Sequence, residues 1–345
     1  MKTVEILQQW TDTEIGNINL NWLEYLNNVF SKSGIKVTKD TTVMITDLSV
    51  FYGVLNLIKQ TSPFLLKNFV MTRIFTYTAP DSNNALRDAY DQYEDDMGYT
   101  KYSRYDYCTR KVLDYPGKIG LTLALTYEYQ KYHFNKNKLE GAIEMIGDLT
   151  EAFIGILKEC DWLDEQTRTK AIDKVDNMIT LLGYPDFIEN PKLLDRYYEN
   201  IRICTWDHFG NSQRLRAFGL ASNLALLGKP RNREIWQLSP LEANAYYNAQ
   251  NNRILFPISM LNPIFYTAKI SALDYGRIGS IIGHEITHGF DNQGMYYDAN
   301  GSFTPGWWSP QTRNEYNKRK DCFVDQYGKY LIPEINEYVS MVLPM

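Results

Sequence analysis

The sequence predicts a mainly α-helical protein with a small β-sheet. Apolar residues recur every three or four positions over long stretches, which is the period of a helix with one buried face. Two short aromatic or β-branched runs in the last third of the chain indicate strands. With 345 residues, of which 44% are hydrophobic and 22% charged, the chain can form one large domain or two ordinary ones.

The first part of the chain, up to about residue 230, is predicted to be helix after helix. One helix is expected over Leu139–Leu157, and a second begins at the acidic residues of Asp164 and Glu165 and is expected to stop at Gly183, with Pro185 beyond it. The apolar face of the first helix has the expected spacing, and its residues are Ile143, Ile146, Leu149, Phe153 and Leu157.

A change of texture follows the Gly- and Pro-containing stretch at 226–236, which is the predicted boundary between two domains. The division is expected to give a helical lobe at 1–230 and a second lobe at 231–345. In the second lobe, Ala245–Tyr247 and Arg253–Phe256 are predicted strands joined by an Asn-rich turn.

The segment from Ser271 to Asp291 returns to helical spacing, and Ser271 with Asp274 resembles a capping box. Its predicted apolar side consists of Ile278, Ile281, Ile282, Ile286 and Phe290.

His284, Glu285 and His288 lie on this predicted helix in the pattern His-Glu-x-x-His. Residues four apart share one face of a helix, so both imidazoles can bind one zinc ion. Zinc lowers the pKa of a bound water to about 7, and an adjacent carboxylate can then act as general base in peptide hydrolysis. The alternative, a chance pattern on a buried helix, is less favoured because the chain has only 4 histidines.

Composition excludes several other classes of function. A net charge of −5 and the lack of a basic cluster argue against nucleic acid as a partner. The chain has no signal peptide and no apolar stretch long enough to span a membrane, so no membrane contact is expected from the chain itself. The four cysteines form no Cys-x-x-Cys pair, which excludes a zinc ribbon, and they are Cys108, Cys160, Cys204 and Cys322.

Several longer segments resemble the neprilysin and endothelin-converting-enzyme family of zinc endopeptidases. They include NAYYNAQNNRILFPISMLNPIFY from Asn244, GRIGSIIGHEITHGFDNQG from Gly276, and the later GWW and CFVDQYG. LKECDWLDEQTRTKAIDKVDNMITLLGYPD, in the first part, resembles the helical lobe of that family. The resemblance implies a partial thermolysin-like zincin catalytic lobe, oligopeptide substrates, and a location at the outer face of the plasma membrane or secretion.

The resemblance also implies roles for individual residues. His284 and His288 match two ligands of one Zn²⁺ ion, and Glu285 matches the general base. Asn244 and Ala245 match an edge-strand pair that hydrogen-bonds the substrate backbone, and Asp291 matches an acid that orients His288. Three further positions match the pocket for the side chain after the cleaved bond, and they are Met260, Phe265 and Ile281. Core packing is the alternative for these three positions and for Ala245 and Asp291.

The family pattern is incomplete in this sequence. The resemblance implies a third zinc ligand, a glutamate in a later Glu-x-x-x-Asp motif, and the sequence after His288 contains no such motif. The resemblance also implies that the disulfide partners of Cys108 and Cys322 lie outside this chain. Two hypotheses follow: a zinc endopeptidase whose activity is weak or absent in this chain alone, or a non-catalytic relative that binds peptides.

Overall fold

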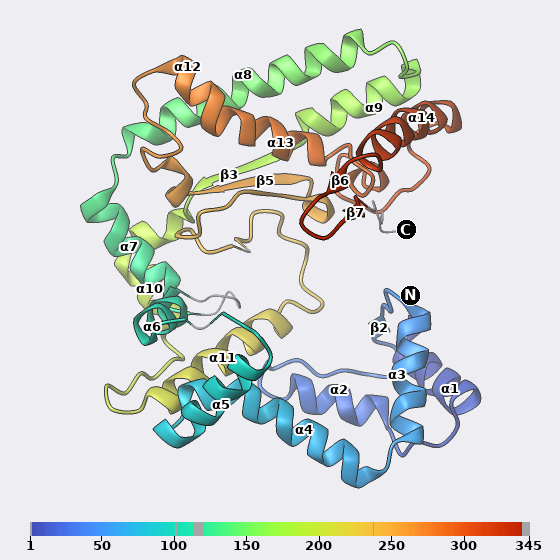
Figure 1. Ribbon diagram of the computed structural model, residues 1–345, viewed down its shortest axis with the longest axis vertical. Coiled ribbons are helices and arrows are strands. Elements are labelled where there is room, and N and C mark those ends of the chain that lie inside the picture. The colour runs from blue at the N-terminus through green and yellow to red at the C-terminus, as the bar shows by residue number, and fades with distance from the viewer. Residues whose placement is uncertain (1, 101, 114–119, 237, 340–345) are drawn as a thin grey trace. The chain divides into compact units, whose positions relative to one another are not determined.

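The computed structural model describes residues 2–100, 102–113, 120–236 and 238–339. The chain forms two compact units, one made of Met1–Thr122 with Asn190–Arg231 and the other of Leu123–Glu189 with Asn232–Met345 (Figure 1). One crossing between the units, at 231/232, falls within the predicted boundary stretch. The units are discontinuous in sequence, however, because 123–189 packs with the second unit rather than with the helices before it.

The first unit is helical apart from a two-stranded antiparallel ribbon. Its helices begin at residues whose side chains accept a first-turn N–H, such as Asn21, Asp47 and Ser62. Asp81 is buried and is neutralised by Lys111 at 2.9 Å and Arg216 at 3.3 Å. The elements are β1 (Lys2–Thr3), α1 (Val4–Glu14), α2 (Trp22–Phe30), β2 (Thr42–Val43), α3 (Leu48–Gln60), α4 (Pro63–Thr78), η1 (Ala79–Asp81), α5 (Asn84–Asp96), α6 (Arg104–Leu113), α10 (Pro191–Tyr198) and α11 (His208–Leu224).

The second unit contains a three-stranded sheet and the helices that pack on it. The elements before the sheet's last two strands are α7 (Thr122–His133), α8 (Asn137–Glu159), α9 (Glu165–Asp176), β3 (Ile179–Gly183) and η2 (Asp186–Glu189). Those that follow are β4 (Tyr246–Asn248), η3 (Ala249–Asn251), β5 (Arg253–Pro257), η4 (Ile258–Leu261), α12 (Ser271–Asp274), η5 (Tyr275–Gly279), α13 (Ser280–His288), η6 (Gly294–Tyr296), α14 (Pro310–Tyr327), β6 (Leu331–Ile332) and β7 (Glu337–Tyr338). The expected class, mainly α with a small sheet, is therefore confirmed.

The sheet has the strand order β3-β5-β4, with β3 parallel and β4 antiparallel to β5. Every residue of β5 is buried, as its central place requires. The predicted strand pair is present as β4 and β5, in a register that puts Tyr247 opposite Ile254. Because β4 pairs only with β5 among the described strands, it forms one edge of the sheet.

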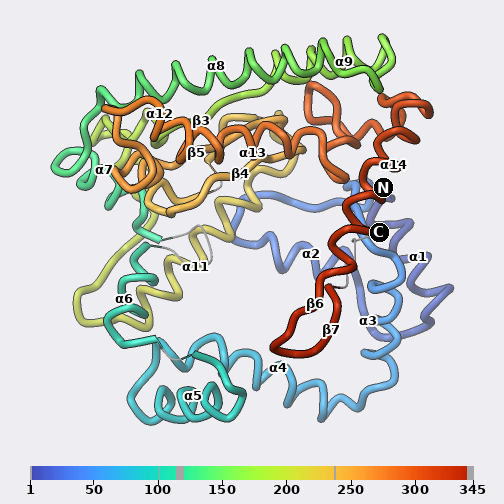
Figure 2. The backbone as a smooth tube through the Cα atoms, turned by 45° about the horizontal axis from the view of Figure 1, so that its top comes forward, coloured from blue at the N-terminus to red at the C-terminus, as the bar shows by residue number. Residues whose placement is uncertain are grey.

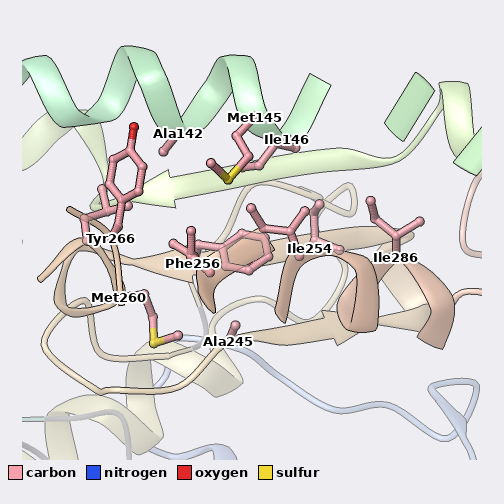
Figure 3. Close-up of a cluster of buried hydrophobic side chains, with 12 residues drawn as sticks. Ala142, Met145, Ile146, Ala245, Ile254, Phe256, Met260, Tyr266 and Ile286 are labelled. Atoms are coloured by element: carbon pink, nitrogen blue, oxygen red, sulfur yellow. The ribbon is translucent and has the colours of Figure 1, made fainter. Parts of the chain in front are cut away.

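Helices α8 and α13 both pack on this sheet, and Figure 2 shows the backbone of these elements. Figure 3 shows the buried cluster that these two helices form with the sheet, where Ala142 and Ile146 of α8 approach Ile254 and Phe256 of β5. Ile286, on the buried side of α13, belongs to the same cluster and is 1% exposed. The core therefore fixes the rotation of α13 and leaves its opposite side for the histidines.

Two local predictions are wrong. The helix that begins at Glu165 ends at Asp176, and Ile179–Gly183 is a parallel strand because its apolar residues pair with β5. The predicted capping box is also absent: the carboxylate of Asp274 accepts hydrogen bonds from the N–H and hydroxyl of Thr267 at 2.7 and 3.0 Å instead. The helical run from Ser271 to His288 contains a π-helical turn at Tyr275–Gly279.

A second cluster joins α8 and α9 to the segment that follows α13. Val175 of α9 packs with Trp307 and Trp308, which are 5% and 3% exposed. Asp164, the N-cap of α9, accepts hydrogen bonds from the Thr312 hydroxyl at 2.5 Å and from Ser309, and so ties α9 to the start of α14. Among the described residues, none of the helices is both long enough and apolar enough for a membrane span.

Candidate active site

Helix α13 brings the two predicted metal ligands together. His284 and His288 are one turn apart, and their Nε2 atoms are 2.9 Å from each other. The ring centroids are 4.4 Å apart and the ring planes are nearly perpendicular, at 83°. Two ring nitrogens that converge in this way can bind a single ion, as the helical spacing predicts.

Asp291 fixes the orientation of His288. Its Oδ2 lies 2.7 Å from Nδ1 of His288, while its Oδ1 accepts the backbone N–H groups of Gln293 at 2.8 Å and Gly294 at 2.7 Å. A carboxylate at Nδ1 favours the tautomer that carries the proton there. In the neutral ring this leaves the lone pair on Nε2, the nitrogen that faces His284.

Glu285 is the buried carboxylate of the site, with 5% of its surface exposed. Its Oε2 has no hydrogen-bond partner within the described part of the chain. Burial raises the pKa of Glu285, and the neighbouring imidazoles of His288 and His284 oppose this increase. A carboxyl group with a raised pKa and a free oxygen is suited to accept a proton at near-neutral pH.

A cleft runs beside α13, and the edge strand β4 forms its other wall. Asn244 and Ala245 precede this strand and line the cleft together with His284, Glu285 and His288. The rest of the lining consists of Tyr246, Tyr247, Asn248, Ala249, Gln250, Asp291, Gln293 and Gly294. The structure thus brings six of the nine predicted site residues to one cleft within the second unit.

The three residues expected to line a substrate pocket lie elsewhere. Met260 is 2% exposed and belongs to the core cluster between α8 and the sheet. Phe265 and Ile281 are partly buried and pack against the same cluster. Their described contacts are those of core packing, and their role in choosing the substrate stays a prediction.

The donor set fits part of a zinc site. Two imidazole nitrogens suit Zn²⁺, and Glu285, whose Oε2 has no partner among the described residues, lines the same cleft. Among the residues that the structure describes, no group of three or more His, Cys, Asp or Glu side chains is arranged to hold a metal ion. His284 and His288 therefore supply two ligand positions, and the described residues supply no third.

Lys174 and Asn252 lie behind the site, and neither is among the residues predicted from the sequence. Both are fully buried, and Lys174 contacts the segment that follows His288. A signal for Lys174 is present in the sequence: it shares a helical face with Ala171 and Val175, where a lysine is unusual.

Comparison with known proteins identifies the family. Two domain models described as Peptidase family M13 match residues 2–185 and 244–341. The chain belongs to peptidase family M13. It is 32% identical to rat (Rattus norvegicus) endothelin-converting enzyme 1 over 317 residues, which cover 91% of this chain and 41% of that protein. It is 32% identical to neprilysin-11 of Caenorhabditis elegans over 305 residues, which cover 87% of this chain and 35% of that protein.

Solved structures of similar proteins agree with this family. The Mycobacterium tuberculosis zinc metalloprotease Zmp1, in complex with an inhibitor, matches with a TM-score of 0.78 and 26% identity, covering 96% of this chain and 47% of Zmp1. PepO of Lactobacillus rhamnosis has the same fold, with a TM-score of 0.75 and 20% identity over 95% of this chain and 49% of PepO. This M13 chain thus spans about 40% of the curated relatives and about half of these structures.

Proposed function

We propose that this M13 chain carries the helix-borne half of a catalytic zinc site and that the protein to which it belongs hydrolyses oligopeptides. The observation that carries the proposal is the convergence of His284 Nε2 and His288 Nε2 at 2.9 Å in the cleft that Glu285 also lines. The buried Oε2 of Glu285 has no hydrogen-bond partner among the described residues. A single Zn²⁺ ion would be held by these two nitrogens. When bound, it supplies Lewis acidity that lowers the pKa of a water molecule to about 7.

Glu285 is the proposed general base. Its Oε2 accepts a proton from the water that attacks the peptide carbonyl and then gives that proton to the departing amine. Burial favours this role because the raised pKa brings the carboxyl group closer to neutral pH. Asp291 holds the proton on Nδ1 of His288 and so keeps Nε2 available as a ligand.

The edge strand β4 is the proposed substrate-binding element. An extended peptide can add to a sheet edge as a further strand, with main-chain hydrogen bonds that are independent of its sequence. Asn244 and Ala245 stand at the start of this edge, in the same cleft as Glu285. The proposed substrates are therefore extended oligopeptides. Placement of the protein outside the cell or at the plasma membrane stays a prediction.

Because the described residues supply only two ligands, we infer that this chain alone binds zinc weakly and turns over slowly. The test is zinc titration of the purified chain together with hydrolysis of a quenched fluorescent peptide, for the wild type and for Glu285→Gln. We expect both proteins to bind zinc, and the substitution to lower any zinc-dependent rate by about 10²–10⁴-fold. Equal rates for the two proteins, or no zinc binding by either, would contradict the proposal.

The alternative is a non-catalytic peptide-binding protein, which the position of β4 at the edge of the described sheet also supports. In that case the chain would bind extended peptides with the same affinity in the wild type and in Glu285→Gln. Neither protein would then show zinc-dependent hydrolysis. Zinc-dependent hydrolysis, measured beside peptide binding by fluorescence anisotropy, therefore separates the two functions.

A further inference from the structure

We propose that Lys174 is a positioning residue for the metal-binding pair: it holds the segment 289–297 so that Asp291 reaches His288. The inference rests on the proposed function, because it gives His288 the role of a metal ligand. It assigns to a residue of α9 an effect on a site that α9 does not line.

The side chain of Lys174 ends among three backbone carbonyls of one segment. It is 0% exposed, and its Nζ donates hydrogen bonds to the carbonyl oxygens of Gly289 at 2.6 Å, Gly294 at 2.8 Å and Tyr297 at 2.7 Å. When protonated, the amino group has three donors and no acceptor, so these three carbonyls then use its full capacity. The contacts clamp the segment at its start, its middle and its end.

The surroundings of Lys174 exclude water and suit a cation. Nζ lies 5.4 Å from the ring centroids of Phe290 and Trp307 and 5.9 Å from that of Tyr247. The carboxylates of Asp291 and Asp298 act on it electrostatically and favour its protonated form. Aromatic faces and carboxylates both favour a positive charge, which offsets part of the cost of burying it.

Asn252 fixes the backbone of Lys174 to the same region. Its side-chain Nδ2 donates to the carbonyl oxygens of Lys174 at 2.8 Å and Ala299 at 2.9 Å. Its Oδ1 accepts from the hydroxyl of Tyr247 at 3.0 Å. Asn252 adopts a left-handed backbone conformation, with φ of 42°, which asparagine tolerates better than most residues. Both ends of the Lys174 side chain are thus held, so the lysine acts as a fixed support.

The segment 289–297 contains Asp291, whose carboxylate contacts His288 of α13. Asp291 lies between two carbonyls that bind Lys174, those of Gly289 and Gly294, and its Oδ2 is 2.7 Å from Nδ1 of His288. Removal of the ammonium leaves these buried carbonyls without a donor, which favours a rearrangement that lets water reach them. Such a rearrangement displaces Asp291 and frees the His288 ring.

The experiment compares Lys174→Met with Lys138→Met in the whole chain. Lys138 is a matched control, because its Nζ also joins two carbonyls of the second unit, those of Leu261 and Tyr266, and neither follows His288. One readout is the ¹⁵N NMR signal of the His288 ring, assigned with His288→Gln. The other is the Kd for Co²⁺, followed by its visible absorption.

We expect Lys174→Met to shift the His288 ring signals toward a mixture of tautomers and to raise the Kd for Co²⁺ about 10–100-fold. Lys138→Met should lower stability without moving either readout. Asp291→Asn should reproduce the effect, and Lys174→Met should add little to it in the double variant, because both act through the same contact. Full additivity would indicate general destabilisation and would overturn the proposal.

Wild-type ring signals and a wild-type Kd in folded Lys174→Met would also overturn it. If that variant does not fold, Lys174→Gln carries the same test, because its amide keeps two donors. A wild-type chain that binds no Co²⁺ would contradict the proposed function alone, since the His288 ring signal still tests the effect of Lys174.

Discussion

The stability of the second unit should increase with pH because Lys174 is buried. Burial lowers the pKa of Lys174 from its ordinary 10.5 to about 7, although the carboxylates of Asp291 and Asp298 oppose this. Between these two values the unfolded chain keeps the proton and the folded chain releases it. The unfolded state therefore binds more protons, and the free energy of unfolding rises with pH in this window.

The magnitude follows from the size of the shift. The difference between a pKa of 10.5 and one of about 7, at about 1.4 kcal/mol per pH unit, gives an upper limit of about 5 kcal/mol for the gain between pH 7 and pH 10.5. Solvent does not screen the charge of Lys174 in the folded chain, because the side chain is 0% exposed. Below pH 7 both states are protonated and this contribution is constant.

The assay is urea unfolding at pH 7, 8, 9 and 10, followed by tryptophan fluorescence, for the wild type and Lys174→Met. Trp307 lies next to the lysine and reports on this unit. Other groups titrate equally in both proteins, so the difference in unfolding free energy isolates Lys174. We expect this difference to move by several kcal/mol in favour of the wild type as pH rises. A difference that is independent of pH would refute the reasoning.

Two further substitutions test the segment that contains Asp291 and the hydrogen bonds that join α9 to α14. A Cβ at Gly294 would lie 2.7 Å from the carbonyl carbon of Gly289, so Gly294→Ala should raise the Kd for Co²⁺ at least 10-fold. Gly283→Ala is the control and should leave the Kd unchanged, because a Cβ at Gly283 meets nothing within 4 Å. Burial raises the pKa of Asp164, but hydrogen bonds from Ser309 and Thr312 lower it by more, so the pKa is below its ordinary value. The ionised Asp164 therefore stabilises the fold above about pH 4, and this stabilisation is lost as pH falls further. Acid unfolding followed by circular dichroism should therefore be less steep in Asp164→Asn, and identical profiles would contradict this.

The convergence of His284 and His288 was predictable from the sequence because its geometry is local. A helix that buries Ile282 and Ile286 necessarily directs His284 and His288 to its other side, whatever the rest of the fold does. The strands β4 and β5 were predictable for the same reason, since a short turn joins them.

The strand β3 was not predictable by the same reasoning. Ile179–Gly183 continues the apolar pattern of α9, and a short apolar run does not distinguish a helix from a buried strand. Its state is decided by β5, whose partner residues begin at Arg253, and parallel pairing of this kind leaves no local turn signal. The same long-range contacts place 123–189 in the second unit. The division into two lobes at residue 230 stays a prediction.

The support of the site could be inferred only from an anomaly. Lys174 lies on the buried face of α9, and a lysine there requires acceptors that the sequence does not identify. They are backbone carbonyls of a segment that begins 115 residues later, and a carbonyl carries no residue-type signature. Sequence patterns therefore reveal the ligands of a site more readily than the groups that hold them.

The two histidines and the groups that hold them come from different parts of the second unit. The histidine pair is complete once α13 is helical, but a ring on an isolated helix still chooses between tautomers and rotamers. In the folded chain Asp291 contacts Nδ1 of His288, and three carbonyls of its segment accept hydrogen bonds from Lys174 of α9, whose neighbour Val175 packs in the second cluster. Metal affinity should therefore depend more on the tertiary packing of the second unit than on the helicity of α13. In this way Lys174, on α9, can affect His288 without contacting it.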